Sequence, residues 1–512
     1  MPQWREREFA LPPSHSVAAC IIDRSAGCAQ NPRMIKEKLL IGGRWTEAGA
    51  TIPIEDPSTG ETIGTLAAGT AKDIDAAVKA AQDAQRGVWG KATAAERGRV
   101  LAKMSVAVTE QVDALADMEA RDVGKPLKQA RADAVALARY LEFYAGAADK
   151  LHGETIPYLA DYTVYTLREP HGVTGHIVPW NYPMQIIGRS VVGALAAGNA
   201  AVLKPAEEAS LTALAFARIA QAAGLPDGAL NLVTGLGEEA GAALAAHPGI
   251  HHLSFTGSTQ VGALVQAAAG RNAVPVTLEL GGKSPQVVFE DANLERALPF
   301  LVNAGIQNAG QTCSASSRLL IQRSIYNEVL EKLAARYRTL RVGPAKDDLD
   351  VGPLISAAQK ARVEDYLKLG SRDGISIVAE GKIVPNAPGG GHYVAPALMA
   401  GMKSDHRLAQ EEIFGPAQVV LPFDDEDEAV AIANGTDYGL VAGVWTRDGS
   451  RAMRMARAIH TGQVFINNYG AGGGVELPFG GVGKSGHGRE KGFEALYAFT
   501  RLKTVAAFHG RD

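Results

Sequence analysis

The sequence predicts an α/β protein with more than one domain, and three observations support this prediction. From Gly172 onward, short apolar runs alternate with alanine-rich stretches of helical spacing, which is the pattern of repeated β-α-β units around a parallel sheet. A second segment of the same texture extends from Pro285 to about Gly474. A chain of 512 residues is also too long for a single hydrophobic core, so we expect two or three domains.

The segment ahead of Gly172 predicts short strands followed by helices. Residues 39–66 are short apolar pieces broken by glycine and proline turns, and residues 71–85 carry apolar side chains at helical spacing. Thr93 and Glu96 have the spacing of a capping box, which predicts the start of a second helix. A further alanine-rich helix is expected after it.

The first α/β region predicts a parallel sheet whose strands end in polar or glycine-containing motifs. We expect strands at residues 173–178, 200–203, 230–233 and 251–255. The motifs that follow these strands are residues 179–183, 204–207, 235–237 and 257–262. Because ligands of such sheets bind outside the carboxyl ends of the strands, this convergence predicts a nucleotide site.

The second α/β region places a thiol in a loop between a helix and a strand. A helix is expected from Leu294 to about Asn308 and a strand over residues 319–322, so Cys313 lies between them. Glu279 ends an apolar run ahead of a Gly-Gly turn. A thiolate and a carboxylate that activates water are sufficient for covalent catalysis through a thioester. Taken singly, each residue also has an ordinary explanation, as a small buried hydrophobe or as a turn residue.

Two glycine-containing motifs fail the spacing of the usual nucleotide fingerprints. Residues 235–241 have three residues between their last two glycines, where the dinucleotide fingerprint has two. Residues 483–485 read Gly-Lys-Ser like the end of a P-loop, but the first glycine that a P-loop requires would fall at Pro478. The sequence therefore excludes a kinase or an NTPase of the P-loop class.

Charge and cysteine usage exclude further classes of function. A net charge of -4 gives no basic surface for nucleic acid, and no apolar run reaches the roughly 18 residues of a membrane helix. The spacing of Cys20, Cys28 and Cys313 suits neither a disulfide framework nor a zinc site, so we expect no metal. This usage favours the reducing cytoplasm.

The first 33 residues differ in texture from the rest of the chain. They contain Pro12-Pro13, scattered charge and no sustained periodicity, and they lack the apolar core of a secretory signal. Met34 stands just ahead of the first expected strand. We therefore expect residues 1–33 to be either a disordered extension or the product of a start codon assigned too early.

Seven motifs occur along the chain in a defined order. They are Pro179-Trp180-Asn181-Tyr182-Pro183, Lys204-Pro205-Ala206-Glu207, Phe255-Thr256-Gly257-Ser258-Thr259 with Gly262, Glu279-Leu280-Gly281-Gly282-Lys283-Ser284, Gly310-Gln311-Thr312-Cys313, Glu412-Ile413-Phe414-Gly415-Pro416 and Pro478-Phe479-Gly480-Gly481. With these motifs, the chain from about Lys38 to about Val505 resembles the aldehyde dehydrogenase superfamily. The resemblance implies a Rossmann-type NAD domain, a second α/β catalytic domain and a small β oligomerisation arm. The implied boundaries are residues 34–152 and 172–278 for the first, 279–480 for the second, and 153–171 and 481–512 for the arm and its bridging segments.

The resemblance implies NAD-dependent oxidation of a small-molecule aldehyde to a carboxylic acid. Cys313 is then the nucleophile, and Asn181 with the backbone N–H of Cys313 stabilises the oxyanion. Hydride transfer leaves a thioester, which a water activated by Glu279 hydrolyses. One alternative is a CoA-acylating semialdehyde dehydrogenase, whose members lack the carboxylate at the place of Glu279. The other is a catalytically silent binding or structural protein, from which we would expect one of these three residues to be lost.

The resemblance also implies NAD as the cofactor and a set of residues that bind it. Lys204 and Glu207 hold the adenosine ribose, and the Glu207 carboxylate repels a 2′-phosphate, which favours NAD over NADP. Gly257 and Ser258 place the pyrophosphate at a helix start. Further implied contacts are Glu412 to the nicotinamide ribose, Phe414 against the nicotinamide, and Ile177, Trp180 and Gly237 along the cofactor.

Three further side chains are expected to contact the substrate. Arg189 lies eight residues after Asn181, roughly two helical turns on, so both could face one cavity. Arg189 pairs either with a substrate carboxylate or with an internal carboxylate, and the sequence leaves both open. Tyr182 and Tyr469 complete the set. The lip near Gly473 lacks the aromatic residue of better-known family members, which predicts a wider substrate tunnel.

Residues 162–168 alternate like a strand at a distance from the next core strand. The resemblance implies that this strand pairs with the last strand of the chain, residues 502–508, and reaches a neighbouring subunit. A hairpin at the surface of a monomer is the alternative. We therefore expect a homodimer or homotetramer, with no nucleic-acid or membrane partner.

Overall fold

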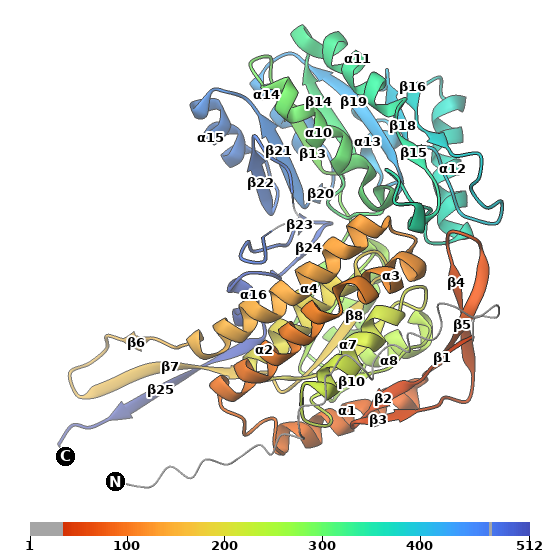
Figure 1. Ribbon diagram of the computed structural model, residues 1–512. Helices are drawn as coiled ribbons and strands as arrows, with labels where there is room; N and C mark the ends of the chain where they lie inside the picture. The colour runs from red at the N-terminus through yellow and green to blue at the C-terminus, as the bar shows by residue number, and fades with distance from the viewer. Residues whose placement is uncertain (1–33, 471–473, 512) are drawn as a thin grey trace.

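The computed structural model describes residues 34–470 and 474–511. The predictions about residues 1–33 and about the lip near Gly473 lie outside the described residues. Two largely parallel sheets, each flanked by helices, form two units, and a three-stranded antiparallel arm extends away from one of them (Figure 1). Among the described residues, no helix combines the length and the apolar content needed to cross a membrane.

The first unit is built on a sheet with a parallel centre. Its parallel strands lie in the order β12 (Val276–Glu279), β11 (His252–Thr256), β8 (Val173–Val178), β9 (Ala200–Pro205) and β10 (Leu230–Leu232). Antiparallel strands extend both edges, with β24 (Gly486–His487) beside β12, and β2 (Leu39–Ile41) and β3 (Arg44–Thr46) beyond β10. The predicted parallel sheet is confirmed, and β24 shows that the chain returns to this unit near its C-terminus.

Helices flank this sheet. They are α1 (Ala71–Arg86), α2 (Ala94–Glu110), α3 (Val112–Val123), α4 (Leu127–Ala147), α7 (Leu211–Ala222), α8 (Ala242–Ala245) and α9 (Thr259–Gly270). The predicted capping box opens α2, because the Glu96 N–H donates to Thr93 Oγ1 at 3.3 Å and the Thr93 N–H donates to the Glu96 carboxylate at 2.7 Å. The apolar side chains of these helices and of the sheet form one continuous core.

The helix after β8 is interrupted, although this part of the sequence has one of the alanine-rich stretches of helical spacing. It consists of α5 (Pro183–Ile186), a π-helical turn (Ile187–Val191) and α6 (Val192–Ala197). A π turn shifts the phase of the following side chains and occurs often at functional sites. Because Arg189 lies inside this turn and Asn181 lies before α5, the two regular turns that the sequence assumed between them are not formed.

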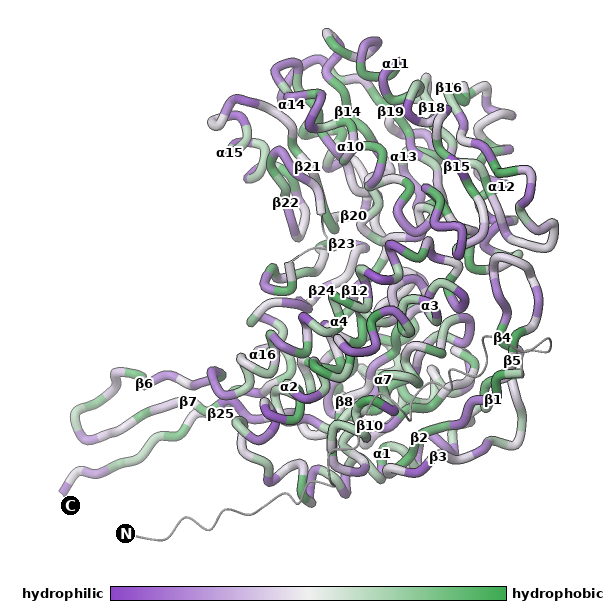
Figure 2. Tube along the Cα trace, viewed as in Figure 1, coloured by the Kyte–Doolittle hydropathy of each residue, from purple (hydrophilic) through white to green (hydrophobic). Residues whose placement is uncertain are grey.

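The second unit is built on a sheet that is parallel except for its edge strand β16. The strand order is β16 (Ser376–Glu380), β18 (Ala397–Ala400), β19 (Ala417–Phe423), β14 (Arg318–Gln322), β13 (Pro285–Val288), β21 (Val441–Trp445) and β22 (Gln463–Ile466). Flanking helices are α10 (Leu294–Ile306), α11 (Tyr326–Tyr337), α12 (Ala357–Arg372), α14 (Glu426–Asn434) and α15 (Gly449–Ala458). Figure 2 shows hydrophobic residues gathered along the sheet strands, where this unit has a core of its own.

The arm is a long antiparallel ribbon. β7 (Tyr162–Pro170) pairs with β25 (Thr500–Phe508) along its whole length, and β6 (Thr155–Ile156) adds a short third strand. The predicted pairing of these two segments is confirmed. Leu502 and Phe508 are 55% and 56% exposed on it. A contact of this arm with a neighbouring subunit stays a prediction.

Candidate active site

A cavity of about 500 Å³ is lined by residues from both units. The first unit contributes side chains at or after the ends of its strands, among them Asn181, Arg189, Ser258 and Glu279, the last residue of β12. The second unit contributes Cys313, Glu412, Phe414 and Tyr469. The cavity therefore brings together the thiol and the carboxylate that the sequence singled out, although 34 positions separate them (313 minus 279).

The loop that carries Cys313 is held in an unusual backbone conformation. Asn308, Ala309 and Gly310 have φ values of 49°, 54° and 72°, in the left-handed region that non-glycine residues rarely occupy. Gly310 is required, because a Cβ at this position would collide with the carbonyl oxygen of Gly415. Such strain persists only where the surroundings fix the loop, as they do here.

The loop is fixed by amide side chains, one of which is Asn181. Asn181 Nδ2 donates to the Gln311 carbonyl at 3.0 Å, and Asn308 Nδ2 donates to the Asn181 carbonyl at 3.0 Å. Gln311 Oε1 accepts from the Ile355 N–H at 2.9 Å. Asn181 is thus anchored two residues from the nucleophile, and its side-chain amide lines the same cavity.

Cys313 is partly exposed to the cavity. Burial raises the pKa of its thiol to about 11, while the guanidinium of Arg189 acts in the opposite direction. The resting group is therefore a thiol, and a positive charge close by favours the thiolate that attacks a carbonyl carbon.

Glu279 is a buried carboxyl group that faces the same space. Neither of its oxygens accepts a hydrogen bond from a described residue. Burial raises its pKa well above the usual range, and Arg189 only partly opposes this. A Cβ at Gly480 would lie 2.8 Å from Glu279 Oε1, so the glycine leaves room for the carboxyl group. A carboxyl group with free oxygens and a raised pKa suits a general base.

Glu412 and Phe414 line the cavity on the side of the second unit. The Glu412 Oε1 atom accepts from the Gly282 N–H at 2.9 Å, and burial raises the pKa of this carboxyl to about 7. Phe414 has a φ of 59° and meets Trp180 edge to face, with ring centroids 5.4 Å apart. Both backbones are held by α12, because Arg362 donates to the Glu412 carbonyl and Gln359 to the Phe414 carbonyl, each at 2.7 Å.

The remaining cofactor candidates lie outside the lining of this cavity, after β9 and β10. Lys204 Nζ donates to Glu207 Oε2 at 2.7 Å, and the Gly237 N–H donates to Glu207 Oε1 at 3.2 Å. A Cβ at Gly237 would meet only Glu207, at 3.9 Å, so open space adjoins this carboxylate. Ile177 is the β8 partner of Lys204.

These groups fit a dinucleotide. Ser258 caps α9, whose first turn carries no acidic residue, so its N-terminal N–H groups suit a pyrophosphate. The Glu207 carboxylate, beside open space, suits the two hydroxyls of a ribose. The motifs that the sequence predicted in the first α/β region therefore converge at the carboxyl ends of the parallel strands of the first unit.

The hydroxyl groups of Tyr182 and Tyr469 are used within the protein. Tyr182 Oη lies 3.0 Å from Thr312 Oγ1, and Tyr469 Oη donates to the Ser314 carbonyl at 2.7 Å. These bonds hold the two residues that flank Cys313. Both tyrosines line the cavity with their rings, so a contact with substrate stays a prediction for each.

Arg189 also lines the cavity, and its charge is matched inside the protein. Its Nε lies 2.5 Å from Glu490 Oε2, and Glu490 Oε1 accepts from Ser254 Oγ at 2.6 Å. The guanidinium packs over the Phe479 ring at 4.8 Å from the centroid. Of the two partners that the sequence left open, the structure provides the internal carboxylate.

Four residues that shape the site were not predicted from the sequence. Phe479 and Lys491 line the cavity, while Gln359 and Arg362 hold the Glu412–Phe414 segment. Phe479 was part of a motif, so that signal was available. Lys491 stands in a Gly-Arg-Glu-Lys-Gly stretch, which in sequence has the composition of an exposed turn.

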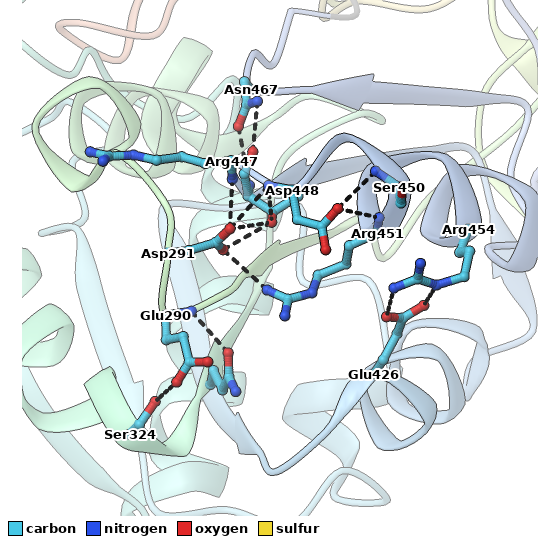
Figure 3. Close-up of polar contacts among 12 residues, drawn as sticks. Glu290, Asp291, Ser324, Glu426, Arg447, Asp448, Ser450, Arg451, Arg454 and Asn467 are labelled. Atoms are coloured by element: carbon cyan, nitrogen blue, oxygen red, sulfur yellow. Dashed lines mark hydrogen bonds and ion pairs between the residues drawn. The ribbon is translucent and has the colours of Figure 1, made fainter.

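A network of polar contacts lies at the carboxyl ends of the strands of the second sheet. Asp291, which follows β13, accepts from Thr446 Oγ1 and the Arg447 N–H at 2.9 Å and from the Asp448 N–H at 3.0 Å. Arg451 Nη1 lies 3.1 Å from the same carboxylate, as Figure 3 shows. The donors around Asp291 come from the chain itself.

Comparison with known proteins places this geometry. The model of the aldehyde dehydrogenase family matches residues 45–505. A hydroxyisobutyraldehyde dehydrogenase from Mycolicibacterium austroafricanum is 42% identical over 470 residues, covering 91% of this chain and 93% of that protein.

Solved structures show the same likeness. A crystal structure from Burkholderia cenocepacia, assigned to the aldehyde dehydrogenases, is 65% identical with a TM-score of 0.92, covering 92% of this chain and all of the other. The betaine aldehyde dehydrogenase of Staphylococcus aureus, solved in complex with NAD+, is 33% identical with a TM-score of 0.90, covering 93% of this chain and 95% of that chain.

Proposed function

The chain belongs to the aldehyde dehydrogenase family, and on that premise we propose that Cys313, Glu279 and Asn181 carry out its NAD-dependent oxidation of aldehydes. The enzyme is an oxidoreductase whose cofactor is NAD. The observation that carries the residue assignment is the meeting of a partly exposed thiol and an unbonded carboxyl group in one cavity.

The first step is addition of the Cys313 thiolate to the aldehyde carbon. Sγ forms a bond to carbon, and the carbonyl oxygen becomes an oxyanion. The side-chain amide of Asn181 and the backbone N–H of Cys313 are the donors for this charge, and such donors contribute about 3–4 kcal/mol each in comparable sites. The Arg189 guanidinium favours the thiolate that this step requires.

The tetrahedral adduct then loses hydride from carbon and becomes a thioester. NAD, when bound, accepts this hydride. The chain positions the cofactor through Glu412 and Phe414 on one side and through the Ser258 turn at the start of α9 on the other. The backbone bonds from Arg362 and Gln359 keep the Glu412–Phe414 segment in place.

Glu279 supports hydrolysis of the thioester. Its carboxylate accepts a proton from water as the water oxygen attacks the acyl carbon. The carbon–sulfur bond then breaks, the carboxylic acid leaves, and Cys313 remains as a thiolate, to which the proton held by Glu279 returns. Because burial raises the pKa of Glu279, this carboxyl group loses its proton at higher pH than an ordinary carboxyl group, and hydrolysis is expected to become faster as pH rises through that raised pKa. The presence of this carboxylate argues against transfer of the acyl group to CoA.

Glu207 supports a preference for NAD over NADP. Its carboxylate is held by Lys204 and Gly237 beside open space, where a 2′-phosphate would meet a like charge. We also propose the domain boundaries given above, a cytoplasmic location, and a homodimer or homotetramer in which the β7–β25 arm contacts a neighbouring subunit.

The direct test of this function is NADH absorbance with a panel of aliphatic, aromatic and carboxylate-bearing aldehydes, with and without CoA. We expect NADH and free carboxylic acid without CoA. Strict dependence on CoA, with an acyl-CoA product, would contradict the hydrolytic role of Glu279.

A further inference from the structure

We propose that Gln129 is a positioning residue for the reaction, which reaches from the first unit to fix the loop that holds Asn181 beside Cys313. The inference rests on the proposed function, because it concerns how the oxyanion donor of that site is kept in place. It gives a role to a helix residue that does not line the cavity and that belongs to none of the seven motifs.

The loop ahead of Cys313 begins where helix α10 stops. The regular helix ends at Ile306. In a continued helix the Asn308 N–H would reach the Ala304 carbonyl oxygen, but this oxygen accepts from the Ser316 N–H at 3.0 Å. Asn308 is 1% exposed and has the left-handed φ of 49°. Its N–H group therefore needs an acceptor from another part of the chain.

Gln129 provides that acceptor. Its Oε1 accepts from the Asn308 N–H at 2.8 Å, across 179 positions of the chain. Gln129 lies in the first turn of α4 and is partly buried. The neighbouring Lys128 attaches the same turn to the second unit, because its N–H donates to Asp348 Oδ1 at 2.8 Å and its Nζ to the Leu349 carbonyl at 3.0 Å. The acceptor is thus held at a fixed place against the loop.

Asn308 passes this constraint on to the catalytic groups. Its Nδ2 donates to the Asn181 carbonyl at 3.0 Å, and its carbonyl accepts from the N–H and from the Nε2 of Gln311, both at 3.0 Å. Asn181 Nδ2 in turn donates to the Gln311 carbonyl at 3.0 Å. Because Gln311 stands two residues before Cys313, the backbone of Asn308 sets where the Asn181 amide and the thiol lie relative to each other.

Loss of this acceptor would act on the reaction as well as on stability. Without Gln129 Oε1, the Asn308 N–H would be buried and unbonded, which costs about as much as its left-handed conformation does. The loop would relax by turning Asn308 out of that conformation, and Gln311 and Asn181 would move with it. A displacement of about 1 Å at a catalytic group can lower a rate by about 100-fold.

The test measures the burst of NADH by stopped flow at saturating NAD, with the aldehyde of the panel above that the wild type oxidises fastest. Gln129→Met keeps the length of the side chain and removes the acceptor, so we expect the burst rate constant to fall by about 10- to 100-fold. Gln129→Glu keeps an acceptor oxygen and should stay within about threefold of the wild type. The affinity for NAD, measured by calorimetry, should be unchanged in both variants.

A double variant shows whether Gln129 acts through Asn181. In Asn181→Ala the amide donor is already missing, so adding Gln129→Met should slow the burst by less than about threefold further. A full multiplicative loss would show that the glutamine acts on some other group and would overturn the proposal.

Gln221 provides a matched control for a general loss of structure. It lies on α7 outside the lining of the cavity, and its Oε1 accepts from Trp45 Nε1 at 2.8 Å. Gln221→Met should lower the melting temperature and leave the burst rate constant unchanged. If Gln129→Met does not fold, Gln129→Asn, whose amide is withdrawn by one carbon, is expected to show the same slow burst.

Two other results would contradict a positioning role for this acceptor. One is a burst as fast as that of the wild type in folded Gln129→Met or Gln129→Asn, and the other is an equally slow burst in Gln129→Glu. Absence of NADH from the wild type with every aldehyde of the panel would instead contradict the proposed function, and the role of Gln129 would fall with it.

Discussion

The two parallel sheets face one cavity with opposite ends of their strands. In the first unit, Asn181, Glu207 and Ser258 all follow strands, so the site lies at the carboxyl ends. In the second unit, Cys313 precedes β14 and Glu412 precedes β19, so the same site lies at the amino ends. The carboxyl ends of the second sheet meet the polar network around Asp291 (Figure 3).

The two sheets differ in this way because the groups that they bring to the cavity have different tasks. Helix N-termini lie at the carboxyl ends of parallel strands, and their N–H groups suit the anionic pyrophosphate of a dinucleotide. The loop of Cys313 instead needs a fixed backbone, which its packing against the Gly415 carbonyl and its bond to Asn181 provide. The rule that ligands bind at carboxyl ends therefore holds for the cofactor unit and not for the unit that supplies the nucleophile.

The largest effect on activity is expected at the amino ends of the strands of the second sheet. Cys313→Ala should lower NAD-dependent oxidation by more than about 1,000-fold, because covalent catalysis is lost. NAD binding, measured by calorimetry, should persist, since most of the groups assigned to the cofactor lie at the carboxyl ends of the strands of the first sheet. Oxidation at a rate near that of the wild type would show that another group is the nucleophile.

A smaller effect is expected at the carboxyl ends of the strands of the first sheet. Glu207→Gln removes one repulsion and part of the bonding to a ribose, worth about 1–3 kcal/mol in the preference for NAD. The ratio of kcat/KM for NAD to that for NADP should fall accordingly, while kcat with saturating NAD is retained. An unchanged ratio would place the adenosine ribose elsewhere.

The smallest effect on activity is expected at the carboxyl ends of the strands of the second sheet. Asp291→Ala removes the acceptor for Thr446 and for two backbone N–H groups, and should cost about 1–3 kcal/mol of stability. A lowered melting temperature with kcat and KM close to those of the wild type is the expected result. A selective loss of activity at unchanged stability would mean that this edge also takes part in the reaction.

The sequence predicted the residues that carry short, ordered motifs. Cys313, Glu279, Asn181, Glu412 and Phe414 all line one cavity, because each motif is a loop next to a strand of a parallel sheet.

Other features could not be predicted, because they depend on contacts between distant segments. Lys491 lines the cavity, and the residue before it, Glu490, forms a bridge with Phe479. The internal partner of Arg189, Glu490, is 301 positions away along the chain (490 minus 189). Strand order and the π turn around Arg189 likewise arise from tertiary packing.

The most direct test of the central claim is the mass of the Glu279→Gln variant after mixing with NAD and an aldehyde. We expect about one NADH per subunit in a burst, followed by slow turnover, and an acyl group of the expected mass on the peptide that contains Cys313. The same treatment of Cys313→Ala should give neither. Unchanged steady turnover in Glu279→Gln would contradict the role of Glu279 in hydrolysis. An acyl group on a different peptide would contradict the role of Cys313 as the nucleophile.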